Sequence, residues 1–560
     1  MYAGIMNKYV FLLILISLFL PGVFAQKNTI KLLAVTDNTQ KGTVVDLDLD
    51  IIDGSGKVLL ETYPLSQIDT QISLRVAKTI ACASTDVYCL NKEFIYSIKA
   101  NSPIIAGPSA GAAITILTLA SLENKKIDPN TVITGTINSG GVIGVVGGAE
   151  EKIKAAHDSG IKRVLVPKGE KNSTELFILA RELNISLIEV SDLEDAFAIF
   201  SNQEKPNRDL FINKEYLEIM KKVNREMCSR TNKLQKEVQN KNITDEKATN
   251  ITQKAKNLTE SGLYYSGASR CFGANSFLQA DIINSENLTK EGYNQKVREV
   301  EKQILEIENY LNSTQIDNLG SLETSMIIRE RIFDAKTNLD DFRKSNATTD
   351  LSYAIERILS AELWKEFMSF SGKKIDASKL KESCVMKLNE VQEVYNYVEI
   401  YMPSLMEESK KELERAKEYL DTNDYALCLF KASKSKAEID AALSTLYFDD
   451  ELINILLENK ILAAKKAIIK QTNKGNFPIL GHSYFEYANA LKESEKYTAL
   501  LYAEYGIEMS NLDIYFPQNK PLEIKINWGA AFTLISGFIM GISIFAFRNA
   551  GRRKITLKRK

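Results

Sequence analysis

The feature of the sequence that most constrains the fold is a series of apolar runs and glycine-rich turns between residues 106 and 167. The turn sequence Gly107-Pro108-Ser109-Ala110-Gly111 favours a tight bend, and the apolar run 112–122 that follows it predicts a helix. A glycine pair then precedes a helical segment at 149–159, and residues 161–167 predict a short buried strand. The stretch therefore predicts two turn-to-helix units followed by a strand.

Two side chains in this stretch suit nucleophilic catalysis. Ser109 is expected where the turn enters the helix, and the unpaired N–H groups of a helix N-terminus can hold a developing oxyanion. A serine hydroxyl needs a base to take its proton, and the chain has only two histidines, His157 and His482. Lys152 can act instead if burial lowers its pKa by a few units. Each half alone is also compatible with ordinary structure.

Together these motifs resemble the proteolytic domain of the Lon protease family. Family members carry a GPSAG turn, a threonine-glycine strand start and a G-G-x-x-E-K helix start, which here are residues 107–111, Thr134-Gly135 and residues 147–152. The 43-residue separation of Ser109 and Lys152 also matches the family. The resemblance implies that Ser109 is the nucleophile, that Lys152 is the general base and that Thr134 orients the lysine. It further implies that Gly107, Pro108, Ala110 and Gly111 shape the turn and its oxyanion site, within an α+β domain over residues 27–200.

The chain departs from the family pattern at three positions. Ala106 stands where the family often has an acidic residue, Thr136 replaces the glutamate of the Thr-Gly-Glu strand, and Glu150 replaces the first lysine of a K-E-K run. None of these changes removes the Ser109–Lys152 pair. They concern the substrate groove and the activation of the enzyme.

Upstream of the turn, the pattern predicts strands. Apolar residues alternate with Asp46, Asp48 and Asp50, which is the period of a half-buried strand. A turn at 53–56 follows, and residues 58–62 are expected to return as the partner of that strand. Residues 66–83 predict a helix. The three aspartates favour a solvated strand face over a calcium site.

Residues 205–515 differ in character. They are rich in Glu, Lys, Leu, Ala and Tyr at helical spacing, which predicts an all-helical domain of antiparallel hairpins. The expected helices include 215–239, 294–312, 380–401 and 405–420. Three similar stretches, at 264–278, 424–441 and 495–508, resemble tetratricopeptide-type repeats, and a plain helical bundle is the alternative. Such surfaces usually bind proteins, or else merely cover a neighbouring domain.

Six cysteines and eight N-x-[ST] sequons are compatible with an exported protein. Six cysteines allow 15 pairings, and pairing of sequence neighbours is preferred. No pair has the C-x-x-C spacing of a zinc site, so no metal is expected; no cofactor is expected either. The preferred pairs are Cys82 with Cys89, Cys228 with Cys271, and Cys384 with Cys428. The sequons begin at Asn172, Asn184, Asn242, Asn250, Asn257, Asn287, Asn312 and Asn346.

The two ends predict a membrane topology. Residues 1–25 read as a cleaved signal peptide, with an uncleaved anchor as the alternative. Residues 528–547 are apolar and long enough to span a bilayer, and the basic tail 548–560 is expected in the cytoplasm. The pair Gly537 and Gly541 is a weak dimerisation signal. A single-pass type I protein with an extracytoplasmic body, combined with the Lon resemblance, looks like the predicted membrane-bound Lon-like proteases of archaea.

The functional expectation is an ATP-independent serine endopeptidase that cleaves unfolded or flexible protein segments outside the cytoplasm. No P-loop string G-x-x-x-x-G-K-[ST] occurs in the 560 residues. The net charge of −1 gives no electrostatic case for nucleic acid, so the expected partners are protein or peptide substrates, the membrane and further copies of the chain. The alternative is an inactive Lon-like fold that acts as a membrane-anchored scaffold through its helical domain.

Overall fold

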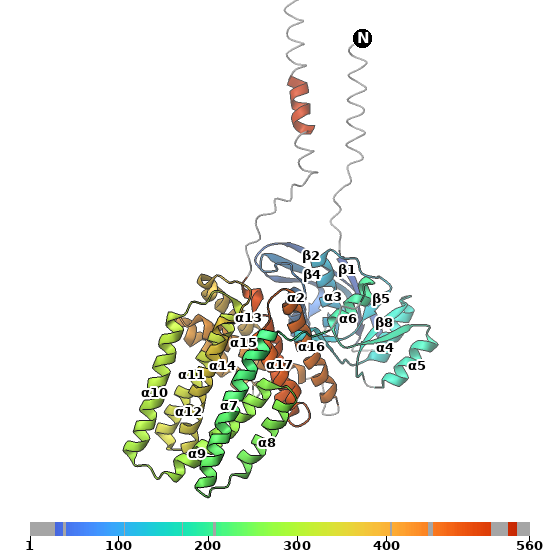
Figure 1. Cartoon of the computed structure of the whole chain (residues 1–560). Helices are drawn as coiled ribbons and strands as arrows, with labels where there is room; N and C mark the ends of the chain where they lie inside the picture. Colours follow the sequence, from blue (N-terminus) through green and yellow to red (C-terminus); the bar gives the residue numbers. More distant parts are fainter. Residues whose placement is uncertain are drawn as a thin grey trace, which may run out of the picture. The chain divides into compact units, whose positions relative to one another are not determined.

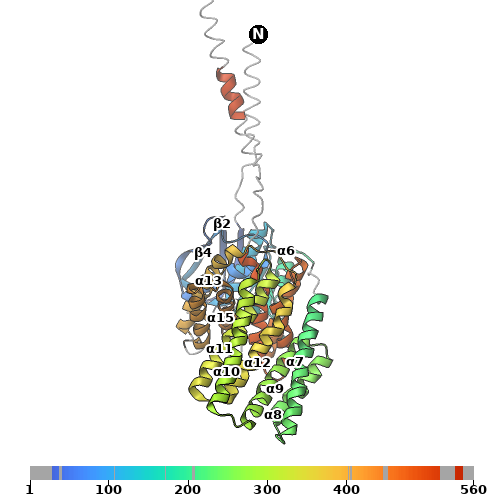
Figure 2. The same ribbon diagram turned by 60° about the vertical axis from the view of Figure 1, so that its left-hand side comes forward.

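The computed structural model describes residues 28–36, 41–105, 107–170, 172–204, 209–401, 403, 406–445, 452–516 and 536–545. The expected signal peptide and basic tail lie outside these residues. The chain up to Phe516 forms one compact unit, and the chain from Pro517 forms a second. The first unit begins with a part that contains a large sheet and continues with an all-helical part (Figures 1 and 2).

A seven-stranded mixed sheet has the strand order β3-β4-β2-β1-β5-β8-β9. Antiparallel pairing joins β1 to β2 and β2 to β4, and all other neighbours in the sheet are parallel. A separate hairpin consists of β6 and β7. The strands are β1 (Asn28–Val35), β2 (Gly42–Asp53), β3 (Val58–Ser66), β4 (Lys92–Ile105), β5 (Thr131–Ile133), β6 (Thr136–Asn138), β7 (Val142–Gly144), β8 (Arg163–Pro167) and β9 (Ser186–Val190).

One expected strand pairing is wrong. The strand after the turn at 53–56 does not return beside β2, because β4 lies between β2 and β3. Strands β3 and β4 are parallel and are connected through α2 (Ile68–Ser84). A parallel connection of this kind needs a crossover helix, and here the sequence supplies one directly after β3. The long strand β4 then pairs with β2 through eight residues, from Asp46↔Lys99 to Asp53↔Lys92.

Helices cover both faces of the sheet. Adjacent strand residues point to opposite faces, so Leu32 joins the core beneath α2, α3 and α6, whereas Leu33 joins the core beneath α4 and α5. The predicted apolar run 112–122 is the buried helix α3. These helices are α3 (Gly111–Glu123), α4 (Ala149–Asp158), α5 (Ser173–Glu182) and α6 (Leu193–Ser201).

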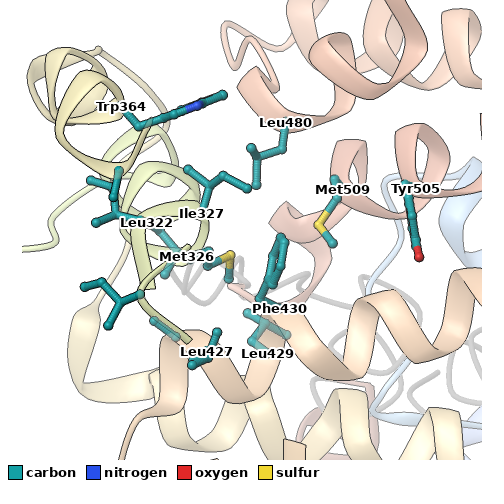
Figure 3. Packing of buried hydrophobic residues seen from close by; sticks show 14 of the residues in the cluster. Leu322, Met326, Ile327, Trp364, Leu427, Leu429, Phe430, Leu480, Tyr505 and Met509 are labelled. Atoms are coloured by element: carbon teal, nitrogen blue, oxygen red, sulfur yellow. The ribbon is translucent and has the colours of Figure 1, made fainter. Parts of the chain in front are cut away.

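The second part is helical, as the sequence predicts. Helices close in sequence pack in pairs, among them α11 with α12, α14 with α15 and α17 with α18. Figure 3 shows their common core, in which Met326, Phe430 and Met509 come from three different helices. The helices are α7 (Lys214–Asn240), α8 (Glu246–Glu260), α9 (Tyr264–Ser285), α10 (Lys290–Ser313), α11 (Leu319–Ser345), α12 (Thr348–Trp364), α13 (Leu380–Tyr401), α14 (Glu407–Asp421), α15 (Tyr425–Thr445), α16 (Ile453–Asn473), α17 (Ile479–Leu491) and α18 (Lys496–Ser510), with 3-10 turns η3 (Lys365–Ser369), η4 (Ala377–Lys379) and η6 (Leu512–Tyr515).

The six cysteines lie in the preferred pairs. Cα–Cα distances are 6.0 Å for Cys82–Cys89, 5.2 Å for Cys228–Cys271 and 5.9 Å for Cys384–Cys428. All three fall within the range that a disulfide allows. The second and third pairs each join two helices of the helical part, α7 to α9 and α13 to α15.

The expected membrane span at 528–547 is described only in part. Residues 536–545 form a helix whose large side chains, such as Phe538 and Ile544, are exposed. Across the described ranges, no helix combines the length and hydropathy that a bilayer crossing requires. The span therefore stays a prediction.

Candidate active site

Topology brings Ser109, Thr134 and Lys152 to one edge of the sheet. Strands β1 and β5 are parallel, so their carboxyl ends meet there, and Thr134 directly follows β5. The turn η1 (Pro108–Ala110) packs against β1 and carries Ser109. Helix α4 begins beside Val35, the last residue of β1, and Lys152 lies in its first turns. Residues separated by 43 positions in the chain thus share one edge of the fold.

The backbone of the Ser109 turn is tied to the strand segment after Thr134. The Gly135 N–H donates to the Ser109 carbonyl at 2.9 Å, and the Ala112 N–H donates to the Gly135 carbonyl at 3.0 Å. Gly111 permits this close approach, because a Cβ there would meet Ile137 at 2.9 Å. The reciprocal pair of hydrogen bonds fixes the start of α3 against the threonine segment.

Asp69 holds the other side of this turn. Its Oδ2 accepts a hydrogen bond from the Gly107 N–H at 2.9 Å, and its Oδ1 accepts one from the Thr70 N–H at 2.7 Å. Gly107 has φ of 100°, a left-handed backbone that favours glycine. The Gly111 N–H is also engaged, because it donates to the Pro108 carbonyl. A carboxylate from α2 thus lies at the turn, although Ala106 supplies none.

Lys152 is a buried cation with 3% of its surface exposed. Its Nζ donates to the Gly147 carbonyl at 2.9 Å. Burial lowers the pKa of Lys152 from 10.5 to about 8, although the carboxylates of Glu170 and Glu151 act in the opposite direction. A useful fraction of the side chain is therefore neutral near neutral pH.

Glu170 supports the loop that precedes Lys152. Its side chain is 7% exposed, and its Oε2 accepts a hydrogen bond from the Val146 N–H at 3.1 Å. The Val146 amide is adjacent to Gly147, whose carbonyl receives the Lys152 Nζ. Glu170 also lines a groove of about 760 Å³ together with Gly147 and Glu151. It therefore fixes the loop and contributes negative charge near the lysine.

The hydroxyl groups at this edge are not engaged with the lysine. Thr134 is buried, and its Oγ1 has no hydrogen-bond partner; the same holds for Thr136. Within the described ranges, no hydrogen bond joins the Ser109 hydroxyl to Lys152. The structure thus places the three residues at one edge without connecting their side chains.

The two histidines lie elsewhere. His157 is in the last turn of α4, half exposed, with Nδ1 3.0 Å from Asp158 Oδ1. His482 is buried among the rings of Tyr216, Phe477 and Phe485 in the helical part. Burial lowers the pKa of His482 to about 4. Neither histidine lies beside the Ser109 turn.

A cleft of about 280 Å³ opens next to the Ser109 turn, between the sheet-containing part and the helical part. Pro108 and Thr136 line it from the first part, and the unpartnered Thr136 Oγ1 is among its groups. Most of its exposed surface is apolar, and charged side chains such as Arg75, Glu393 and Lys436 also line it. The apolar residues from α2 are Ile72, Val76 and Ile80, and those from the helical part are Val394, Val398 and Leu443.

The helical part also holds the loop between β6 and β7. Lys460 of α16 and Glu504 of α18 are both fully buried and form an ion pair at 2.6 Å. The Ser139 hydroxyl donates to Glu504 Oε2 at 2.6 Å, and Lys460 Nζ donates to the Ser139 carbonyl at 3.1 Å. Gly140 packs so closely that a Cβ would meet Ala463 at 2.7 Å. Two helices thus fix the hairpin that follows Thr134.

The sequence alone did not single out Asp69, Glu170 or the Lys460–Glu504 pair. Asp69 is 38 residues from Gly107, and Lys460 is 321 residues from Ser139. The only local signal is the position of Asp69 at a helix start, which is common. The described residues contain no group of three or more His, Cys, Asp or Glu side chains arranged to hold a metal.

Comparison with known proteins agrees with this geometry. Residues 25–199 match the Lon protease (S16) C-terminal proteolytic domain. The Lon protease of Buchnera aphidicola subsp. Acyrthosiphon pisum is 34% identical over 140 residues, which are 24% of this chain and 18% of the relative. Lon protease of Mycoplasma genitalium is 29% identical over 164 residues (28% and 20%), and that of Methanosarcina barkeri is 28% identical over 138 residues (24% and 17%).

The fold of the α/β domain, with its serine turn and buried lysine, is thus that of a peptidase domain. The sheet-containing part of this chain is similar to the proteolytic domain of Lon proteases. The chain spans about a fifth of the length of the curated relatives that it matches. The matched region ends before the helical part begins.

Proposed function

We propose that the protein is a serine endopeptidase in which Ser109 is the nucleophile and Lys152 the general base. The observation that carries this proposal is the burial of Lys152 at the edge that also holds the Ser109 turn. A lysine with a pKa of about 8 can exist as a neutral base near neutral pH. The similarity of residues 25–199 to the Lon proteolytic domain supports the same chemistry.

In the first step, the neutral Lys152 amine takes the proton of the Ser109 hydroxyl while Oγ attacks the peptide carbonyl. For this proton transfer, Lys152 Nζ and Ser109 Oγ must approach to about 2.6–3.2 Å. Such contacts are often longer when no substrate is bound. The Gly147 carbonyl accepts an N–H of the amine, which leaves the nitrogen lone pair for the serine proton. The ammonium then protonates the leaving amine. Lys152 next deprotonates the water that hydrolyses the acyl-enzyme.

The oxyanion is assigned to the Ser109 N–H, because the Ala110 N–H already takes part in the 3-10 turn. Pro108 has no N–H, and the Gly107 and Gly111 amides donate to Asp69 and to the Pro108 carbonyl. Asp69 acts as a positioning residue because it fixes the first residue of the turn. Thr134 is a further positioning group, whose unpartnered Oγ1 suits a hydrogen bond to the lysine during the reaction.

The cleft beside Pro108 suits the side chain of the residue that precedes the scissile bond. Its apolar walls favour an aliphatic or aromatic group. Because Val394 and Val398 belong to the helical part, that part completes the substrate site in addition to covering the domain.

The setting of the activity belongs to the same proposal. We infer that the protein works outside the cytoplasm and that residues 528–547 anchor it in the membrane. We also infer that it needs no ATP. The terminal sequence patterns, the three cysteine pairs and the absence of a P-loop string support this setting. The sequons are compatible with glycosylation, and the glycines at 537 and 541 with self-association.

The test is cleavage of casein by the purified full-length chain in detergent, beside Ser109→Ala. We expect cleavage by the wild type only, with new carboxyl termini enriched in apolar residues. Cleavage that survives in Ser109→Ala would contradict the nucleophile. An inert wild type would favour the alternative of a membrane-anchored scaffold, and termini of random composition would reject the apolar cleft as the side-chain site.

A further inference from the structure

The helical part contains a cavity of about 550 Å³ that is separate from the candidate active site. Aromatic rings form much of its wall, among them Tyr265, Tyr484, Tyr502 and Trp364. Figure 3 shows Trp364 and Ile327, which both line the cavity, in the packed core between α11 and α12. The volume lies in the range of small-molecule binding pockets, about 300–1,000 Å³.

The charged residues that line the cavity are paired, with one exception. Arg357 pairs with Asp334 at 2.9 Å, Lys434 with Glu330 at 3.0 Å and Arg270 with Glu495 at 2.7 Å. Arg331 lines the same cavity, is 8% exposed and forms no ion pair with any described carboxylate. Its Nε has no hydrogen-bond partner, and its guanidinium lies 5.4 Å from the centre of the Trp364 ring.

A buried cation that forms no ion pair is costly, and proteins rarely keep one without a function. Burial, followed by the charge of Arg357, lowers the pKa of Arg331. Arginine presents a planar fork of donors that matches a carboxylate. The surplus in this cavity is one positive charge, which a monoanion would balance and a doubly charged phosphate would exceed.

We propose that this cavity binds a monocarboxylate with an aromatic or apolar body, whose carboxylate pairs with Arg331. The ring-lined wall supplies the surface for the body. Arg270 and Arg357 are partly exposed at 19% and 20% of their side chains, so a ligand can enter on their side. The carboxylate belongs either to a free small acid or to the C-terminal residue of a polypeptide. This inference does not depend on the proposed peptidase activity.

The test uses the Ser109→Ala full-length chain, so that no peptide is cleaved. Binding of N-acetyl-L-tryptophan is compared with binding of its amide, which has the same body without the charge. We expect the acid to bind at least about tenfold more tightly, as a bidentate charged pair predicts. A second pair of probes, acetyl-Gly-Gly-Trp as acid and as amide, distinguishes the two sources of the carboxylate. If the peptide acid binds more tightly than N-acetyl-L-tryptophan, the ligand is a polypeptide C-terminus. If it binds more weakly, the ligand is a free small acid.

Substitution of Arg331 provides the control. Arg331→Met should abolish the preference for the acid and should raise the Tm of the unliganded protein, because it removes an uncompensated buried charge. Arg329→Met is the matched variant on the same helix, since Arg329 pairs with Asp424 at 2.9 Å outside the cavity. It should leave the preference intact. Equal binding of acid and amide, no binding of either, or a preference that persists in Arg331→Met would overturn the proposal.

Discussion

Lys152 is a cation that the fold keeps away from water, and this property links catalysis to stability. Burial lowers its pKa to about 8, so about a tenth of the side chain is neutral at pH 7. The exposed Lys154 in the same helix has a pKa raised by its hydrogen bond with Glu150. The contrast shows that position in the helix, and not residue type, makes one of the two lysines suitable as a base.

The first prediction concerns the pH dependence of activity. With Lys152 as base, kcat/KM should rise about tenfold per pH unit below about 8 and level off above it, because only the neutral amine accepts a proton. The measurement is cleavage of an unfolded substrate from pH 6 to 10. His157→Gln should keep this profile, and Lys152→Arg should abolish cleavage. A plateau that already begins at pH 7 would argue for a different base.

The second prediction concerns stability. Between pH 8 and 10.5 the unfolded state binds more protons than the folded state, so this group makes stability rise with pH across that window. Its charged burial costs about 3 kcal/mol at pH 7, offset by about 1 kcal/mol from the Gly147 hydrogen bond. Lys152→Met should therefore stabilise the fold by about 2 kcal/mol in urea unfolding at pH 7. Lys154→Met should change stability little, and a loss of stability in Lys152→Met would contradict this account.

At the residue scale, the backbone conformation of asparagine explains the positions of several sequons. Every non-glycine residue with positive φ among those described is an asparagine, and five of them begin sequons. Asparagine tolerates the left-handed conformation that ends a helix. Local backbone conformation therefore accounts for these five positions, whether or not they carry glycans: Asn184, Asn242, Asn287 and Asn346 lie just after helices, and Asn172 directly precedes α5.

At the scale of elements, periodicity predicted many of the helices, but among the described strands it predicted only β2, β3 and β8. The apolar run 112–122 became α3, and residues 380–401 are α13 with the same bounds. The pairing of β3 failed because strand partners are chosen across the sheet, and the long strand β4 outcompetes a local hairpin for β2. Local sequence also carries no signal for contacts such as Asp69 with Gly107, which require a particular packing of α2.

The third prediction tests the buried ion pair through which α16 and α18 hold the β6–β7 hairpin in place. Lys460→Met leaves Glu504 buried without its partner, which should cost about 3–5 kcal/mol of stability. Lys460→Met with Glu504→Met should recover much of that loss, because no isolated charge remains. Denaturant unfolding of both single variants and the double variant gives the coupling energy. A double variant as unstable as the sum of the singles would mean that the pair is not coupled.

At the scale of the whole molecule, the proteolytic domain and the helical part form one compact unit and share the cleft beside Pro108. The Lon proteolytic-domain match covers residues 25–199, in the first part of this unit. No P-loop string occurs in the 560 residues, and the proposed function therefore assigns the chain no motor of its own to unfold substrates. Cleavage of a packed domain then requires its own unfolding free energy, about 5–15 kcal/mol.

The fourth prediction follows from this energetic limit. The purified chain should degrade a destabilised reporter and spare its stably folded counterpart, and ATP should have no effect on either. Gel-based degradation with and without ATP checks both statements. Equal degradation of the two reporters, or strong stimulation by ATP, would contradict this energetic limit.

The central claim is that Lys152 activates Ser109, and the most direct test is the site and rate of fluorophosphonate modification. The full-length chain is labelled at pH 8, and the adduct is mapped by mass spectrometry. We predict a single adduct on Ser109, with a labelling rate at least about 100-fold lower in Lys152→Ala and unchanged in His157→Gln. No adduct, an adduct on another serine, or an unchanged rate in Lys152→Ala would contradict the account.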